Sequence, residues 1–168
     1  MRGSWENERR VNVTMAGIKI VAENRRARAE FAIEETYEAG IVLVGTEVKA
    51  LREGKANLKE SYADVRNGEA WLIGCHINPY EKGNINNHEA TRSRKLLLHS
   101  EEIKRLLGKT QEKGFSLVPM KMYFSKGKAK VELGLGRGKK LYDRRHELKE
   151  RVAKREVERA LRERHKGA

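Results

Sequence analysis

The chain has 168 residues, a formal net charge of +13 at pH 7, and 36% charged against 38% hydrophobic residues. This length accommodates one domain with appendages, and the positive charge indicates an acidic partner, either nucleic acid or an anionic membrane. A membrane is the weaker choice, since the basic end of the chain lacks the broad Trp, Phe and Leu face of interfacial helices.

The single cysteine, Cys75, excludes an internal disulfide and fits a reducing cytosol. The sequence contains no signal peptide and no apolar run of membrane-spanning length. We therefore expect a cytoplasmic protein without a membrane partner.

Residues 1–23 are expected to form a disordered leader before the folded domain. Within it, residues 1–14 are a polar stretch that precedes a second methionine, Met15. This stretch is either expression-derived or an upstream-start extension, so it is set aside when the fold is predicted.

The first strand is predicted to begin at Phe31, because apolar side chains then alternate along the chain up to Tyr37. Gly40 interrupts this alternation, and residues 41–44 are continuously apolar. A glycine has no side chain to pack, so we expect the strand to break there.

A short helix is predicted after this apolar run. Thr46 is its expected N-cap, the carboxylate of Glu47 suits the positive end of a helix, and Gly54 suits its stop. Val48 and Leu51 share the face that would be buried.

The clearest local pattern is a β-hairpin centred on Asn67-Gly68. This dipeptide tolerates the positive φ angles of a type I′ turn, and it separates strand-like segments at 62–66 and 69–77. Pro79 lacks a backbone N–H and should end the second strand.

Residues 80–94 are rich in Asn, Gly, His and Arg, and they predict a long polar loop of the kind that is usually functional or disordered. A short strand is predicted over 95–98, and then a helix capped by Ser100. The buried face of this helix is expected to comprise Ile103, Leu106 and Leu107.

A second hairpin is predicted from segments 115–125 and 128–135, which turn at Lys126-Gly127. With about six short strands and two short helices, the segment 24–136 is expected to be mainly β with peripheral helices, folded as a small closed antiparallel β-barrel. A β-sandwich is the alternative. Closure is favoured because a barrel leaves no free strand edge.

The last segment, residues 137–168, is a basic tail with 13 Lys and Arg against 6 Asp and Glu. The alternating glycines at its start, Gly134, Gly136 and Gly138, are interpreted as a flexible hinge. The tail's apolar residues drift around a helix and form no continuous stripe, so we expect it to be helical or disordered alone and ordered by a polyanion. Three i,i+4 pairs support the helix: Glu147 with Arg151, Glu150 with Lys154, and Glu158 with Arg162.

Three basic clusters are candidate RNA contacts, because guanidinium groups bind phosphates bidentately and stack on unpaired bases. They comprise Arg25, Arg26 and Arg28; His88, Arg92, Arg94 and Lys95; and Lys139, Lys140, Arg144 and Arg145 around Tyr142. Each also has a plainer interpretation as a solvated basic surface. Tyr142 is a candidate for stacking on a nucleobase, since it stands among cations beyond the last predicted strand.

A zinc site is a second interpretation of four residues: Cys75, His76, His88 and His99. Their spacing matches no ligand pattern, and neighbouring Cys75 and His76 would face opposite sides of one strand. We therefore expect no metal and no other cofactor. No nucleophile elbow, Walker loop or dinucleotide loop is present, so an enzyme is not expected.

Five strings carry a family resemblance: NRRAR at 24–28, YEAGIVLVGTEVKALREGKANLKESY at 37–62, HINPYEKGNINNH at 76–88, RSRKLLLH at 92–99 and KVELGLGRGKKLYDRR at 130–145. They closely resemble the SsrA-binding protein (small protein B, SmpB) family, from about residue 24 to the end of the chain. The resemblance implies an oligonucleotide-binding (OB) barrel with peripheral helices and a basic C-terminal tail.

The resemblance also implies a function in bacterial trans-translation. In this process, alanyl-charged transfer-messenger RNA (tmRNA) is delivered to ribosomes stalled on messages that lack a stop codon. The implied partners are the tRNA-like part of tmRNA, the small ribosomal subunit with its 16S rRNA, and the elongation factor EF-Tu; we expect the chain itself to be a monomer. A general single-stranded-RNA chaperone and a ribosome-associated structural protein are the alternatives.

By position, the resemblance assigns tmRNA binding to the blocks that contain Asn24, Glu38, Leu97 and His99. His99 departs from the asparagine of other family members. With the basic clusters, the predicted tmRNA-binding residues are Asn24, Arg25, Arg26, Arg28, Glu38, His88, Arg92, Arg94, Lys95, Leu97 and His99.

In the tail, GKKLYDRR at 138–145 resembles the family block GKKxYDKR, with Arg144 in place of a lysine. The resemblance implies that this segment enters the ribosomal decoding centre and that the following helix fills the empty message channel. The predicted residues are Gly138, Lys139, Lys140, Tyr142, Asp143, Arg144 and Arg145.

Overall fold

The computed structural model describes residues 13–14, 17–80, 89–112 and 114–167. Most of its strands belong to one eight-stranded antiparallel sheet. These strands are β1 (Val13–Thr14), β2 (Ile18–Glu23), β3 (Phe31–Ile41), β5 (Tyr62–Arg66), β6 (Glu69–Ile73), β8 (Arg94–Leu97), β9 (Phe115–Ser125) and β10 (Lys128–Gly138). A separate small sheet pairs β4 (Ala56–Asn57) with β7 (His76–Ile77). The helices are α2 (Arg25–Glu30), α3 (Gly45–Arg52), α4 (Ser100–Gln111) and α5 (Leu141–Lys166).

Six strands of the large sheet form a ring. Their order is β9-β10-β3-β8-β6-β5, and β5 pairs back to β9 through Ala63 and Leu117. The chain is therefore mainly β with several helices. Because the ring strands share one sheet, the structure argues against a sandwich of two separate sheets.

Both predicted hairpins are confirmed. Asn67 and Gly68, between β5 and β6, have φ angles of +52° and +74°. Lys126 and Gly127, between β9 and β10, have φ angles of +50° and +75°. Positive φ at both central residues is what a type I′ turn requires, and its twist matches that of the flanking strands.

The strand predicted over 69–77 is wrong in its extent, because β6 ends at Ile73. Gly74 has a φ of +77°, which turns the chain out of the strand. The turn also shifts the alternation of side chains, so Cys75 is buried together with Leu72. A local alternation pattern does not reveal such a turn inside an apolar run.

The expected leader is shorter than predicted, since residues 18–23 form β2 and pair with β9. The expectation of disorder over 1–23 is wrong for this strand. Its partner is the edge of a strand about 100 residues later in the chain, and pairing across that distance is a tertiary effect that overrides weak local signals. Residues 1–12 and 15–16 lie outside the described residues.

The interpretation of the alternating glycines as a hinge is wrong, because Gly134, Gly136 and Gly138 all lie in β10. A Cβ atom on Gly136 would lie 2.2 Å from the carbonyl oxygen of Ala32. A Cβ atom on Gly134 would lie 3.0 Å from Cδ1 of Ile33. At these two positions glycine allows β3 to approach closely, and β10 continues to Gly138.

In α3 and α4, carboxylates and not hydroxyl groups bind the free N–H at the start of the helix. α3 begins after Val44, whose N–H donates to Glu47 Oε1 at 3.1 Å. α4 begins after His99, whose N–H donates to Glu102 Oε1 at 3.2 Å. In both cases an acid three residues into the helix binds the free N–H of the cap residue. The caps predicted from hydroxyl side chains are therefore wrong: Thr46 and Ser100.

The hydrophobic core lies inside the ring and is closed at one end by α4. Leu72, Leu106 and Met122 are fully buried there, and Ile103 packs against them. Leu107 is 38% exposed, so the buried face predicted for α4 is confirmed only in part.

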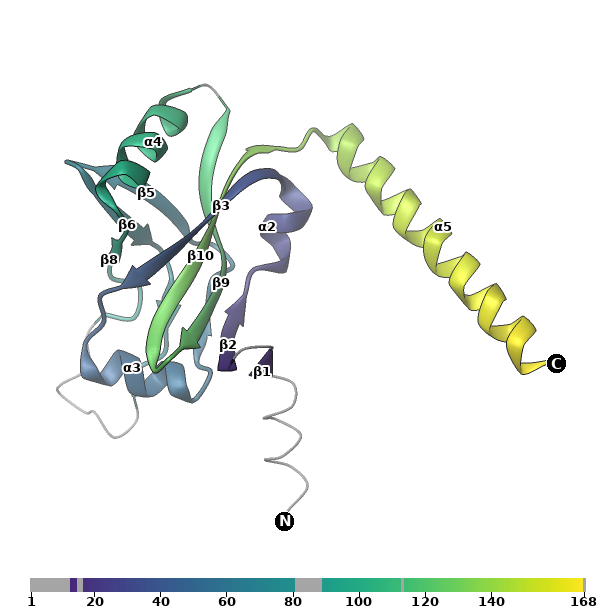
Figure 1. Cartoon of the computed structure of the whole chain (residues 1–168), viewed down its shortest axis with the longest axis horizontal. Helices are drawn as coiled ribbons and strands as arrows, with labels where there is room; N and C mark the ends of the chain where they lie inside the picture. The colour runs from purple at the N-terminus through teal and green to yellow at the C-terminus, as the bar shows by residue number, and fades with distance from the viewer. Residues whose placement is uncertain (1–12, 15–16, 81–88, 113, 168) are drawn as a thin grey trace, which may run out of the picture.

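The long helix α5 projects away from the body, as Figure 1 shows. Its apolar side chains are about half exposed, and none of them packs on the body core: Leu148, Val152, Val157 and Leu161. The tail is a helix in the structure, and the bonds of Lys139 to the body lie at its root.

Candidate nucleic-acid interface

Asn24 fixes α2 to the sheet. Its Oδ1 accepts a hydrogen bond from the N–H of Ala27 at 3.2 Å, and its Nδ2 donates to the carbonyls of Leu58 and Pro119 at 3.3 and 3.1 Å. Only 6% of the residue is exposed. These polar atoms are engaged inside the protein, so the structure places Asn24 as the residue that positions α2.

The three arginines of α2 face solvent. The side chain of Arg25 is 92% exposed, and its nearest acid is Glu23 at 4.0 Å. Arg26 Nε donates to Glu30 at 2.5 Å and remains half exposed, and Arg28 is also exposed. Exposed guanidinium groups on one short helix suit bidentate contacts with phosphates.

Four strands place one residue each in a row across the outer face of the sheet: Leu97, Gly40, Lys130 and Tyr123. Leu97 is 54% exposed, and a Cβ atom added to Gly40 would lie 3.3 Å from the Cβ atom of Leu97. Leu97 therefore covers the space left by the glycine. β3 runs through Gly40 to Ile41, so the predicted break at Gly40 is wrong.

Glu38 lies beside this row on the same face. Its carboxylate pairs with Lys130 Nζ at 2.6 Å and accepts a hydrogen bond from the hydroxyl of Tyr123. The hydrogen bond from Lys130 lowers the pKa of Glu38, whereas burial and the neighbouring carboxylate raise the pKa of Tyr123. Glu38 is therefore ionised at neutral pH, and its half-exposed carboxylate can accept hydrogen bonds from a base or sugar.

Glu132 stands opposite Glu38 on β10, and its Oε2 lies 3.2 Å from Lys121 Nζ on β9. The Lys121 ammonium also lies 5.7 Å from the centroid of the Tyr123 ring. Glu38 and Glu132 therefore each have a lysine nearby. Sequence reasoning missed the lysines and the tyrosine of this face, although their alternation along β9 and β10 was a usable signal: Lys121, Tyr123 and Lys130.

Arg94 is completely buried, so the prediction that it contacts RNA is wrong for this residue. Its Nε donates to Glu47 Oε2 at 2.5 Å. Its two Nη groups donate to the carbonyls of Cys75, Ala90 and Arg92 at 2.7, 3.0 and 3.1 Å. A guanidinium enclosed in this way holds the surrounding backbone and presents no donor to solvent.

Glu47 joins α3 to the segment that precedes β8. Arg92 donates to one carboxylate oxygen and Arg94 to the other. Burial raises the pKa of Glu47, but the hydrogen bonds from Arg92, from the N–H of Val44 and from Arg94 outweigh it, and the net pKa is lowered. Sequence reasoning identified Glu47 only as a helix-end acid, because no local pattern links residues this far apart.

Two further predicted residues of the body lie in β8 or just after it. Lys95 shares the outer face with Leu97, two residues on, and its ammonium pairs with Glu69 at 3.0 Å. His99 is exposed at the start of α4. His88 lies outside the described residues.

Lys139 attaches the tail to α2. Its backbone N–H donates to the carbonyl of Glu30 at 2.7 Å. Its ammonium donates to the carbonyl of Arg28 at 3.0 Å and pairs with Glu147 at 2.6 Å. Gly138, predicted as part of the tail, is the last residue of β10. The carbonyl end of the arginine-bearing helix therefore holds the root of the tail.

The first turn of α5 follows directly. Lys140 is its N-cap residue, and Arg144 donates to the carbonyl of Lys139 at 3.3 Å from both Nε and Nη2. Arg145 is exposed one residue later. Two predicted tail residues lie on α5 with side chains outside the described ones: Tyr142 and Asp143.

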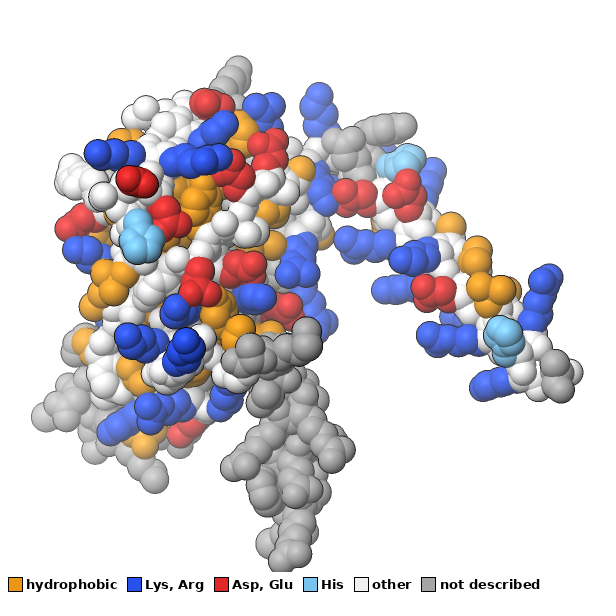
Figure 2. All heavy atoms as spheres, viewed as in Figure 1, with side chains coloured by type: hydrophobic (Ala, Val, Ile, Leu, Met, Phe, Trp, Pro, Cys, Tyr) orange, Lys and Arg blue, Asp and Glu red, His pale blue; other side chains and the backbone are white. Residues whose placement is uncertain are grey.

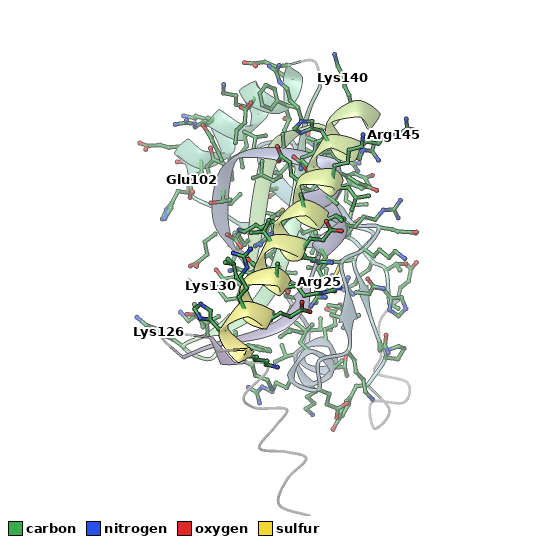
Figure 3. The ribbon with its side chains drawn as sticks, turned by 90° about the vertical axis from the view of Figure 1, so that its right-hand side faces the viewer. Arg25, Glu102, Lys126, Lys130, Lys140 and Arg145 are labelled. Carbon is green, nitrogen blue, oxygen red and sulfur yellow. The ribbon has the colours of Figure 1, made fainter. Side chains whose placement is uncertain are left out.

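Cations of the body and of the tail border the same open side of the molecule. Figure 2 shows Lys and Arg side chains along the flank of the body that faces α5 and along the flank of α5 that faces the body. Figure 3, viewed from that side, labels Arg25, Lys126 and Lys130 on the body and Lys140 and Arg145 on the tail. The arrangement suits contact with a polyanion at two separate surfaces.

Within the described ranges, no group of three or more His, Cys, Asp or Glu side chains could hold a metal ion. In the same ranges, every helix is too short or too polar to cross a bilayer. The charged groups of the described surface are ammonium and guanidinium donors together with carboxylate acceptors.

Comparisons with known proteins agree with this surface. The model of the family "SmpB protein" matches residues 21–163. The SsrA-binding protein of Shouchella clausii is 58% identical over 149 residues, which cover 89% of this chain and 96% of that protein. The SsrA-binding protein of Desulforudis audaxviator is 60% identical over 144 residues, or 86% of this chain and 94% of that one. A chain of the solved structure "tmRNA-SmpB: a journey to the center of the bacterial ribosome" is 57% identical, with a TM-score of 0.61 over 71% of this chain and 84% of that chain.

Proposed function

Because the chain belongs to the SmpB protein family, we propose that it binds tmRNA and acts with it in trans-translation on the ribosome. In this proposal the chain helps to deliver alanyl-tmRNA to the A site of stalled ribosomes. It acts as an adaptor with no catalytic step and no cofactor of its own.

The observation that supports the proposal most directly is the separation of two cationic surfaces. One surface belongs to the body and consists of the exposed arginines of α2, beside the outer sheet face, whose lysines are paired with carboxylates. The other is α5, which lies away from the body and carries the excess of Lys and Arg in residues 137–168. Two separate surfaces suit one protein that must contact two RNA partners at once.

We propose that the body is an OB-like barrel that grips the tRNA-like part of tmRNA. Arg25, Arg26 and Arg28 contact phosphates, since their guanidinium groups are exposed. Leu97 packs on sugar or base, and Glu38 accepts hydrogen bonds from them. We also propose that the remaining predicted residues contact tmRNA: Arg92, Lys95 and His99, together with His88, which lies outside the described residues.

Two predicted residues act through others. Asn24 positions α2, since its amide is bound inside the protein. Arg94 positions the segment before β8, since its guanidinium is buried with Glu47. Substitution of either residue therefore disturbs RNA binding by moving its neighbours.

We propose that the segment Gly138 to Arg145 occupies the decoding centre and that α5 follows the empty message channel against 16S rRNA. An exposed basic helix can order along phosphates where no message lies. Lys139, Lys140, Arg144 and Arg145 supply the charge, Asp143 belongs to the same block, and Tyr142 stacks on an exposed base. EF-Tu joins in the delivery complex, and the chain acts as a monomer in the cytoplasm.

The RNA that co-purifies with the tagged chain from its native cell tests the proposal. We expect strong enrichment of tmRNA over other RNA at matched salt, because phosphate attraction alone is blind to sequence. Arbitrary RNA bound as well as tmRNA would instead identify a general single-stranded-RNA chaperone. Constant co-sedimentation with ribosomal subunits that are not stalled would identify a structural ribosomal protein.

A further inference from the structure

A hollow of about 440 Å³ lies where α2, the outer sheet face and the root of α5 meet. This volume falls in the range of ligand-binding pockets. Its floor and sides include Arg28, Phe31, Ile33, Thr36, Met120 and Glu132, and the tail root closes one side through Lys139 and Glu147.

The floor of the hollow is apolar. Met120 is 5% exposed and belongs to a small cluster with Ala27 and Val118, against which Phe31 and Ile33 pack. Gly134 lies beneath this floor, and a Cβ atom there would meet both Ile33 Cδ1 and Met120 Sδ at 3.0 Å. The floor therefore offers an aromatic ring and polarisable side chains to a flat apolar surface.

The rim carries polar groups of both kinds. Glu132 Oε2 lies 3.2 Å from the Lys121 ammonium, but among the described residues this buried oxygen has no partner in hydrogen-bond geometry. Thr36 presents an exposed hydroxyl and Arg28 an exposed guanidinium. The rim can thus accept hydrogen bonds through Glu132 and donate them through Arg28.

We propose that this hollow binds one unpaired nucleobase of tmRNA, stacked on the Phe31, Ile33 and Met120 floor with an amino or imino N–H donated to Glu132. This inference rests on the function proposed above and names a contact within it. A base has two apolar faces and a polar edge, which match the floor and the rim. The neighbouring α2 arginines match the flanking phosphates, and that charge complementarity favours RNA over an apolar protein side chain as the occupant.

Filling the hollow tests the proposal. Thr36→Trp places an indole over the floor from an exposed strand position, and it is expected to weaken tmRNA binding at least about tenfold, the loss of one stacked base. Leu107→Trp, at a 38% exposed position on α4 and outside the hollow, is the matched control and should bind as wild type does. Thermal melts of both variants verify that each remains folded.

The salt dependence of binding separates loss of the base from loss of phosphates. Thr36→Trp should lower affinity at every salt concentration and leave the slope of log affinity against log salt unchanged. Arg28→Ala, which removes a phosphate contact, should reduce that slope by about one. An unchanged affinity in a folded Thr36→Trp variant would overturn the base-binding hollow.

Crosslinking locates the contact directly. Ultraviolet irradiation of the wild-type complex, followed by mass spectrometry, should join a nucleotide to the peptide that contains Phe31 or to the one that contains Met120. Crosslinks confined to other peptides would overturn the inference and leave the proposed function standing. Failure of the wild-type chain to bind tmRNA would overturn the proposed function, and the inference with it.

Discussion

The body and the tail use charged side chains in opposite ways. In the body, Glu47 is enclosed by two arginines, and Glu38 of the outer face is paired with Lys130. In α5, most of the described charged side chains are exposed to solvent, and Lys139, just before the helix, bonds the root of the tail to the body. Buried charge in the body holds elements in place, whereas most of the charge in the tail is exposed, as are the arginines of α2.

The apolar residues show the same contrast. The apolar residues of the ring pack into one continuous core, but in α5 the step from Val152 to Val157 is five residues and breaks any stripe. A helix without a buried stripe gains little from packing and depends on its own hydrogen bonds and side-chain pairs. In the described part of α5, the i,i+4 contact within 4 Å is His146 Nδ1 with Glu150 Oε1, at 3.3 Å, and none of the three predicted pairs lies within that distance. The tail is therefore the part whose conformation a partner can most readily change.

Truncation after Lys140 should produce the largest functional effect. It removes α5 but keeps the bonds of Lys139 to the carbonyls of Arg28 and Glu30. We expect tagging of stalled nascent chains to be abolished in a reconstituted translation assay. The affinity for free tmRNA should fall by no more than about threefold, because the body retains its phosphate contacts. A tmRNA affinity that collapses on truncation would show that the two surfaces do not work separately.

Arg94→Met should break the body and leave the tail intact. It leaves Glu47 buried with one arginine in place of two and removes the donor to three backbone carbonyls, so we expect a loss of about 3–5 kcal/mol in the free energy of unfolding. Urea denaturation measures this loss. Arg25→Met is the matched control, because its side chain is 92% exposed, and its stability should stay within about 0.5 kcal/mol of wild type. Only the control should weaken RNA binding without a change in stability.

Tyr142→Ala sharpens the assignment of the tail. If the ring stacks on a base of the decoding centre, tagging should slow by about tenfold, the effect of one lost stacking contact. Binding of free tmRNA should not change, since α5 is not part of the body surface. Tyr142→Phe keeps the stacking face and should retain most of the activity. Equal tagging by the alanine and wild-type chains would remove Tyr142 from the mechanism.

Sequence reasoning predicted the elements whose signals are local. The two hairpins follow from Asn67-Gly68 and Lys126-Gly127, because positive φ is a property of the dipeptide itself. β2 and the full length of β10 depend on partners far away in the chain, and no local pattern encodes them. The glycines of β10 were misread for the same reason, since the atom that excludes a side chain at Gly136 belongs to Ala32.

The candidate site was predicted in a similar way. Composition located Arg25, Arg26 and Arg28, because a run of arginines is visible without a fold. Composition could not separate Arg94 from Arg92, although one is fully buried and the other partly exposed. Both arginines bind Glu47, and the distinction depends on the backbone carbonyls that surround Arg94, among them that of Cys75, 19 residues earlier in the chain. Family resemblance found Glu38 and Leu97 but did not show that Gly40 brings them to one face.

Gly136→Ala tests whether the glycines of β10 serve packing or motion. The added methyl group would meet the Ala32 carbonyl at 2.2 Å, so the strands must separate locally, and we expect a loss of about 1–3 kcal/mol in the free energy of unfolding. Gly138→Ala is the control, because nothing lies within 4 Å of its Cβ position. Comparable losses of stability in the two variants would contradict the packing explanation.

Acid should affect the body through Glu47, with the smallest of these effects. The pKa of Glu47 is lower in the folded chain than its ordinary value, so the unfolded chain binds the proton more tightly. The stabilisation from Glu47 is therefore complete above the unfolded pKa of about 4.3, and it is lost as the pH falls through the folded value. Glu47→Gln should be less stable than wild type at pH 7, and the difference should narrow between about pH 5 and pH 3. Melting temperatures measured at constant ionic strength over this pH range follow the narrowing. Glu101→Gln, on the exposed face of α4, is the control, and its plot of melting temperature against pH should run parallel to that of wild type. If the melting temperature of Glu47→Gln stays at a constant distance from that of wild type down to pH 3, the negative charge of Glu47 does not stabilise the fold.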